Sequence, residues 1–127
     1  MILDFIDIKK EDISLAGGKG ANLGELTSAK INVPKGFVIT ADAYKAFLKE
    51  NSIDKIIEKN LREASLDEST LLKAAGYFRK LIISGRFSKE IQQLITDKYK
   101  SLGENVRVAI RSSATAEDLP DASFAGQ

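Results

Sequence analysis

The sequence has 127 residues, a formal net charge of +1, and neither cysteine nor histidine. A chain of this length builds one modest domain, and a charge so close to zero makes nucleic acid an unexpected partner. The missing residue types exclude disulfides, thiolate nucleophiles, the usual zinc sites and imidazole proton transfer. We therefore predict a single domain over residues 1–127 that binds no nucleic acid.

The N-terminal stretch predicts a short strand and no membrane segment. Residues 2–6 are mostly apolar, but Asp4 and Asp7 interrupt them before they reach the length of a signal-peptide core. No apolar run in the sequence approaches the length that spans a bilayer. We expect no membrane partner and a cytoplasmic location.

Four of the nine glycines lie between Gly17 and Gly24, a stretch that also holds Lys19 and that we call the glycine segment. A helix is expected from about residue 18 or 19 to residue 29. Glycines ahead of a helix expose amide donors, and the partial positive charge of the helix N-terminus would act with Lys19 on a phosphate. The spacing matches neither the P-loop nor the dinucleotide-binding fingerprint. The alternative is a helix start with a solvent-facing lysine.

A turn at residues 33–36 and a strand at residues 36–40 precede a helical middle that runs to Gly103. Thr40 is expected to cap the first helix of this region and Ser88 to open the last, with Gly103 as a left-handed cap residue. Apolar residues recur at helical spacing throughout. Four aromatic residues on these apolar faces are expected in the core: Tyr44, Phe47, Phe78 and Tyr99.

The period of the apolar residues changes from helical to two near the C-terminus. Val106, Val108 and Ile110 alternate with other residues, which predicts a strand running into Arg111. A polar loop follows, and a long loop of this kind is typical of a binding segment. An arginine at this place is suited to bind phosphate oxygens, but it can equally pair with a carboxylate.

The polar loop carries three carboxylates, Glu117, Asp118 and Asp121. Oxygen ligands of this kind bind Mg²⁺, although acidic residues beside a proline and serines more often form turns. The adjacent pair Glu117 and Asp118 does not indicate general acid/base catalysis, because neighbours in a loop need not face one cavity.

Three stretches, which form two motifs, carry a resemblance to a known family. Residues 17–26, GGKGANLGEL, and residues 33–40, VPKGFVIT, are similar to the opening of the pyruvate- and ATP-binding domain of the phosphoenolpyruvate synthase family. Residues 110–127, IRSSATAEDLPDASFAGQ, which we call the C-terminal motif, resemble the second motif of that family. Rifampicin phosphotransferases share both motifs, whereas pyruvate phosphate dikinase shares only the first closely.

The resemblance implies an α/β fold: the N-terminal lobe of an ATP-grasp domain, with a helix-rich middle flanked by short strands. It implies ATP as the ligand, with Lys19 and Arg111 on its phosphates and Gly126 as a backbone contact. The implied parent is a longer multidomain phosphotransferase of the pyruvate, water dikinase type. It would convert ATP, pyruvate and water to AMP, phosphoenolpyruvate and phosphate through a phosphohistidine on a domain absent here.

The same resemblance places the Mg²⁺ ligands in a second lobe that this sequence lacks. No catalytic residue is therefore expected within these 127 residues, and the fragment alone should be inactive. Two alternatives stay open on sequence grounds: the ATP-binding portion of a rifampicin phosphotransferase, and a stand-alone binding module without catalysis.

Overall fold

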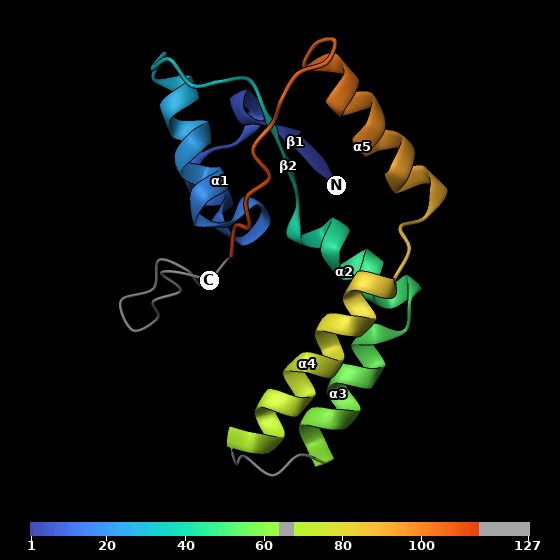
Figure 1. Ribbon diagram of the computed structural model, residues 1–127. Helices are drawn as coiled ribbons and strands as arrows, with labels where there is room; N and C mark the ends of the chain where they lie inside the picture. Colours follow the sequence, from blue (N-terminus) through green and yellow to red (C-terminus); the bar gives the residue numbers. More distant parts are fainter. Residues whose placement is uncertain (64–67, 115–127) are drawn as a thin grey trace. The chain divides into compact units, whose positions relative to one another are not determined.

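The computed structural model describes residues 1–63 and 68–114, and it shows a mostly helical α/β chain with a small two-stranded sheet (Figure 1). Its elements in chain order are β1 (Ile2–Asp4), η1 (Phe5–Asp7), η2 (Lys10–Asp12), α1 (Ile13–Ser28), β2 (Phe37–Ile39), α2 (Ala41–Glu50), α3 (Ile53–Glu63), α4 (Glu68–Ser84) and α5 (Lys89–Ser101). Across this described part, no helix combines the length and apolarity needed to cross a bilayer.

Contacts divide the chain into two compact units, which are described separately. The first unit holds residues 1–43 together with the described residues from 93 onward, and the second holds residues 44–92. Both the glycine segment and the described part of the C-terminal motif belong to the first unit.

The first unit is built on the antiparallel pair β1 and β2, in which Leu3 lies opposite Val38. Directly after β2, the buried Thr40 donates from its amide and its hydroxyl to the carbonyl of Met1, at 3.0 and 3.1 Å. The same hydroxyl accepts from the amide of Ala43 at 3.4 Å. This last bond confirms Thr40 as the cap of α2, and the bonds to Met1 tie that helix start to the sheet.

Small residues allow α1 to lie close to its neighbours. Gly20 and Gly24 are buried, one helical turn apart on the same side of the helix. A β-carbon at position 20 would stand 3.2 Å from Cγ2 of Val38, and one at position 24 would stand 2.8 Å from Cβ of the buried Ile8. Gly20 therefore allows α1 to pack against β2, and Gly24 allows it to pack against Ile8 in the segment that precedes α1.

Helix α1 is broken at Gly17, where φ is 69° and ψ is 170°. The helix predicted from about residue 18 is confirmed, and it ends at Ser28. The sequence did not predict the helical turn that precedes the break, residues 13–16.

The chain after α5 turns back within the first unit. Gly103 has the predicted positive φ, at 136°, and the hydroxyl of Tyr99 donates to the carbonyl of Val106 at 2.8 Å. Lys98 on α5 forms an ion pair with Asp4 of β1, with 2.5 Å between Nζ and Oδ2. These contacts hold α5 and the following segment beside the sheet.

The strand predicted at residues 106–111 is wrong. These residues have no regular secondary structure and no strand pairing, and the sheet of the described residues contains β1 and β2 alone. A strand exists only where a neighbour accepts its backbone hydrogen bonds, and alternation of apolar residues does not supply that neighbour. Ile110 is 94% exposed, so its side chain is not covered by a second layer.

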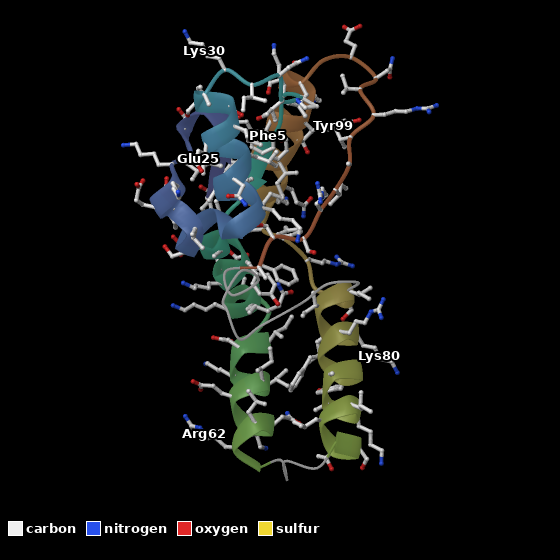
Figure 2. The ribbon with its side chains drawn as sticks, turned by 90° about the vertical axis from the view of Figure 1, so that its left-hand side faces the viewer. Phe5, Glu25, Lys30, Arg62, Lys80 and Tyr99 are labelled. Carbon is white, nitrogen blue, oxygen red and sulfur yellow. The ribbon has the colours of Figure 1, made fainter. Side chains whose placement is uncertain are left out.

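The second unit contains the helix pair α3 and α4, which lie side by side in both views (Figures 1 and 2). Arg62 and Lys80 project from the outer sides of this pair (Figure 2). Elsewhere in the second unit, the ring of Phe47 contacts that of Phe87, with 4.8 Å between the ring centroids. Asn51 joins two loops there, since its side chain donates to Arg86 O and accepts from Arg86 N, both at 3.0 Å.

The predicted core positions of the aromatic residues hold only in part. Phe47 is buried as expected and Phe78 is half-buried, whereas Tyr44 and Tyr99 are 48% and 42% exposed. Tyr44 is covered on one side, where its ring stacks on Phe47 at 6.5 Å. The hydroxyl of Tyr99 donates to the carbonyl of Val106 at an exposed position, so this ring has its polar end at the surface.

Candidate functional site

The glycine segment and the C-terminal motif contact each other directly. The amide of Gly18 donates to the carbonyl of Ala114 at 3.3 Å, and the amide of Gly20 donates to Oγ of Ser113 at 3.2 Å. The Ser113 hydroxyl in turn donates to the carbonyl of Ala16 at 2.8 Å. The glycine segment and the C-terminal motif both carry the family resemblance and lie far apart in the sequence, and here they form one structural feature of the first unit.

Only glycine fits at position 17. Its backbone angles, φ 69° and ψ 170°, lie in a region that residues with a side chain hardly ever enter. A β-carbon there would also stand 2.8 Å from the carbonyl carbon and oxygen of Ser113. Gly17 is therefore required both by the break in α1 and by the close approach of the C-terminal motif.

This geometry corrects one part of the sequence hypothesis. One of the two interpretations of the sequence had the glycines expose amide donors to a phosphate, but the amides of Gly18 and Gly20 donate to protein acceptors on Ala114 and Ser113. The glycine segment is a docking site for the C-terminal motif, in contrast to a P-loop, whose amides cradle the ligand.

Lys19 and Arg111 lie on the two segments that meet. Lys19 is half-buried in the first turn after the Gly17 break, between the two glycines bonded to the C-terminal motif. Arg111 is exposed and stands two residues before Ser113. Since two residues of extended chain span at most about 7 Å, the backbone of Arg111 is held close to the glycine segment.

The remaining predicted site residues lie outside the described part of the structure. These are Gly126 and the carboxylates Glu117, Asp118 and Asp121. Within residues 1–63 and 68–114, no three acidic or other metal-ligating side chains gather at one place. The described residues alone therefore do not supply a donor set for Mg²⁺.

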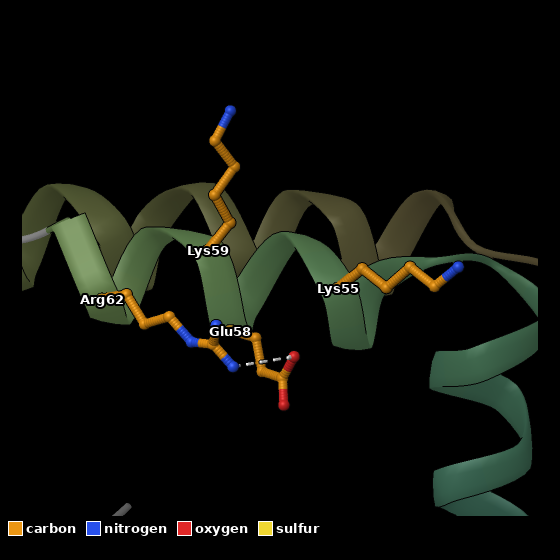
Figure 3. A pocket seen from close by; sticks show the side chains of 4 residues that line it. All are labelled: Lys55, Glu58, Lys59 and Arg62. Atoms are coloured by element: carbon orange, nitrogen blue, oxygen red, sulfur yellow. Dashed lines mark ion pairs between the residues drawn. The ribbon is translucent and has the colours of Figure 1, made fainter.

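A surface hollow in the second unit does not resemble a binding site. Its lining comes from the single helix α3, with the side chains of Lys55, Glu58, Lys59 and Arg62 (Figure 3). Arg62 and Glu58 form an exposed ion pair across it at 3.8 Å. Side chains one turn apart on a solvated helix face leave such hollows between them, and neither of the two motifs contributes to this one.

Sequence reasoning missed Ser113. It is one of several hydroxyl residues in the C-terminal motif, and nothing in its spacing distinguishes it from Ser112. The signal that exists is indirect: a glycine that opens a helix has no side chain to cap it, which leaves that position open to a capping group from another part of the chain.

Comparison with known proteins identifies relatives over the whole chain. A probable phosphoenolpyruvate synthase of Methanothermobacter thermautotrophicus is 44% identical over 129 aligned residues, which cover 97% of this chain and 19% of that protein. The phosphoenolpyruvate synthases of Deinococcus radiodurans and Escherichia coli are 41% and 40% identical over all of this chain and 17% of their own length. The chain thus spans less than a fifth of each of these relatives.

The family model described as the pyruvate phosphate dikinase AMP/ATP-binding domain matches residues 13–127. The match includes the glycine segment, the helical middle and the C-terminal motif. It begins at the first residue of α1 and so contains every residue of the contact between the two motifs. The chain belongs to the pyruvate phosphate dikinase AMP/ATP-binding domain family.

Proposed function

We propose that this chain is the N-terminal lobe of an ATP-grasp domain and binds ATP through Lys19 and Arg111, which contact the phosphates, and Gly126, which contributes a backbone contact. The observation that supports the proposal most directly is the hydrogen bonding between the glycine segment and the C-terminal motif. This hydrogen bonding joins the two segments that carry the cationic residues. The family match to an AMP/ATP-binding domain supports the nucleotide.

Charge stabilisation is the chemistry that these two residues offer. Phosphoryl transfer depends mainly on positioning and on neutralising the charge of the phosphate oxygens. A cation about 4 Å from such an oxygen gains roughly 4 kcal/mol before desolvation at an effective dielectric constant of about 20. Two cations therefore hold and orient the phosphates, whereas the acceptor and its phosphorylated intermediate require other groups.

The parent protein, in this proposal, is a phosphoenolpyruvate synthase of the cytoplasm. It uses ATP, pyruvate and water and works through a phosphohistidine on another domain, with Mg²⁺ held by a second lobe. The names and lengths of the relatives support a longer synthase. None of these observations favours the antibiotic-phosphorylating alternative or a stand-alone binding module.

The test uses the full-length enzyme that contains this chain. Lys19→Ala and Arg111→Ala should each lower kcat/KM for ATP by roughly 10- to 100-fold, the loss expected for a hydrogen bond to a charged group. Matched controls are Lys10→Ala and Arg107→Ala, which remove exposed cations of the same unit. Equal ATP dependence in all four variants would refute the proposed binding residues.

A further inference from the structure

The break in α1 at Gly17 creates a second helix start inside this element. A helix start normally carries a serine, threonine, aspartate or asparagine whose side chain accepts from an amide two or three residues later. Gly17 occupies that place before the second part of α1 and has no side chain. The amide three residues later, that of Gly20, is the one that such a capping side chain would bind.

Ser113 supplies the missing cap. Its Oγ accepts from the Gly20 amide at 3.2 Å and donates to the carbonyl of Ala16 at 2.8 Å. A hydroxyl has one donor and two acceptor positions, so one side chain can make both bonds. Ala16 ends the helical turn before the break and Gly20 lies in the turn after it. A single hydroxyl therefore bridges the two parts of α1.

This bridge lies beside Lys19. The residues on either side of Lys19 are Gly18, whose amide donates to Ala114, and Gly20, whose amide donates to Ser113. Arg111 belongs to the same C-terminal segment, two residues before Ser113. The positions of the two cations are thus coupled through hydrogen bonds at residues 113 and 114, without an intervening helix or strand.

We propose that Ser113 is a positioning residue, which sets the placement of Lys19 relative to Arg111 for binding the phosphates of ATP. The inference rests on the proposed function, since it assigns to Ser113 an effect on ATP that acts through Lys19. Loss of the hydroxyl leaves the Gly20 amide and the Ala16 carbonyl without this partner, and the turn that carries Lys19 then relaxes away from the C-terminal motif.

The experiment is a double-mutant cycle in the full-length enzyme, read as kcat/KM for ATP and as the midpoint of thermal unfolding. Ser113→Ala is expected to lower kcat/KM by about tenfold, equivalent to about 1.4 kcal/mol. In a Lys19→Ala background the same change should have less than a twofold effect, because the residue through which Ser113 acts is already gone. Ser112→Ala, which removes the exposed neighbouring hydroxyl, is the matched control and should stay within twofold of the native enzyme.

The cycle distinguishes a positioning role of Ser113 from a purely structural one, and both from a failure of the proposed function. If Ser113→Ala lowers kcat/KM equally in both backgrounds, its role is only structural and the inference is wrong. If Lys19→Ala itself leaves kcat/KM unchanged, the proposed function fails, independently of the result at Ser113. Should Ser113→Ala not fold, Ser113→Cys fills the same space with a much weaker hydrogen-bonding group and takes its place in the cycle. A folded Ser113→Cys enzyme with native kcat/KM for ATP would also overturn the inference.

Discussion

Ser113 lies so close to Gly17 that a β-carbon at position 17 would stand 2.8 Å from the Ser113 carbonyl carbon. Gly17→Ala therefore has two free-energy costs. A residue with a side chain loses about 1–3 kcal/mol in adopting these backbone angles, and the steric overlap with Ser113 costs about 1–3 kcal/mol more. We expect the free energy of unfolding to fall by about 3 kcal/mol, measured by chemical denaturation.

Gly76→Ala is the matched control for that substitution. Gly76 lies inside α4, and a β-carbon there would meet no heavy atom within 4 Å. Because alanine is the better helix former, this variant should gain about 0.5–1 kcal/mol of unfolding free energy. A Gly17→Ala variant as stable as Gly76→Ala would show that the break in α1 does not require glycine.

The ion pair between Lys98 and Asp4 should contribute measurably to stability. The side chain of Lys98 is 36% exposed and that of Asp4 is 40% exposed, and their charged atoms are in direct contact. A double-mutant cycle with Lys98→Met and Asp4→Asn should give a coupling energy of about 0.5–1 kcal/mol, reduced at high salt. The exposed pair of Arg62 and Glu58, one helical turn apart at 3.8 Å, is the comparison and should couple more weakly, by about 0.3–0.5 kcal/mol. Equal coupling in the two pairs would contradict this account.

Asn51 should be the most sensitive polar residue of the second unit. Its side chain donates to Phe47 O at 2.8 Å and to Arg86 O at 3.0 Å, and it accepts from Arg86 N at 3.0 Å. Asn51→Ala removes all three bonds and should lower the free energy of unfolding by about 2 kcal/mol.

Asn60→Ala is the control for Asn51, since Asn60 makes its one described bond to Ile56 within its own helix, at 2.8 Å. The gain in helix propensity offsets that bond, so a change within about 0.5 kcal/mol is expected. Comparable losses for the two asparagines would mean that the link to Arg86 contributes little.

The 127-residue chain by itself should bind ATP with a dissociation constant of about 1 mM or weaker. Two cations neutralise only part of the triphosphate charge, and in the described residues no cluster of carboxylates is available to hold a metal ion beside it. An NMR titration with ATP and Mg²⁺ would measure the constant. A micromolar value would show that the chain contains a more complete site than the one proposed.

The sequence predicted the parts of the fold that depend on local chemistry. Thr40 caps α2 and Gly103 has a positive φ, because such roles depend on one side chain or its absence. The prediction of a strand at residues 106–111 was wrong, because strand pairing depends on a neighbouring strand that the alternation of apolar residues does not reveal.

In the candidate site, too, the sequence predicted local features and missed long-range contacts. Motif similarity singled out Lys19 and Arg111, and the structure shows that the segments carrying them meet. The sequence did not predict how they meet, because the bond from Gly20 to Ser113 joins residues 93 positions apart. Contacts of that range depend on the whole fold, so neither periodicity nor spacing within one motif indicates them.

The cap supplied by Ser113 has a consequence for how the chain is made. Ser113 follows Gly20 by 93 residues, so at roughly 5 to 20 residues per second a ribosome adds it about 5 to 19 s later. During that interval the nascent chain can form the later turns of α1, while the junction at Gly17 stays unsupported. The amino-terminal end of this helix therefore matures among the last features of the first unit, although its residues are translated before most of that unit.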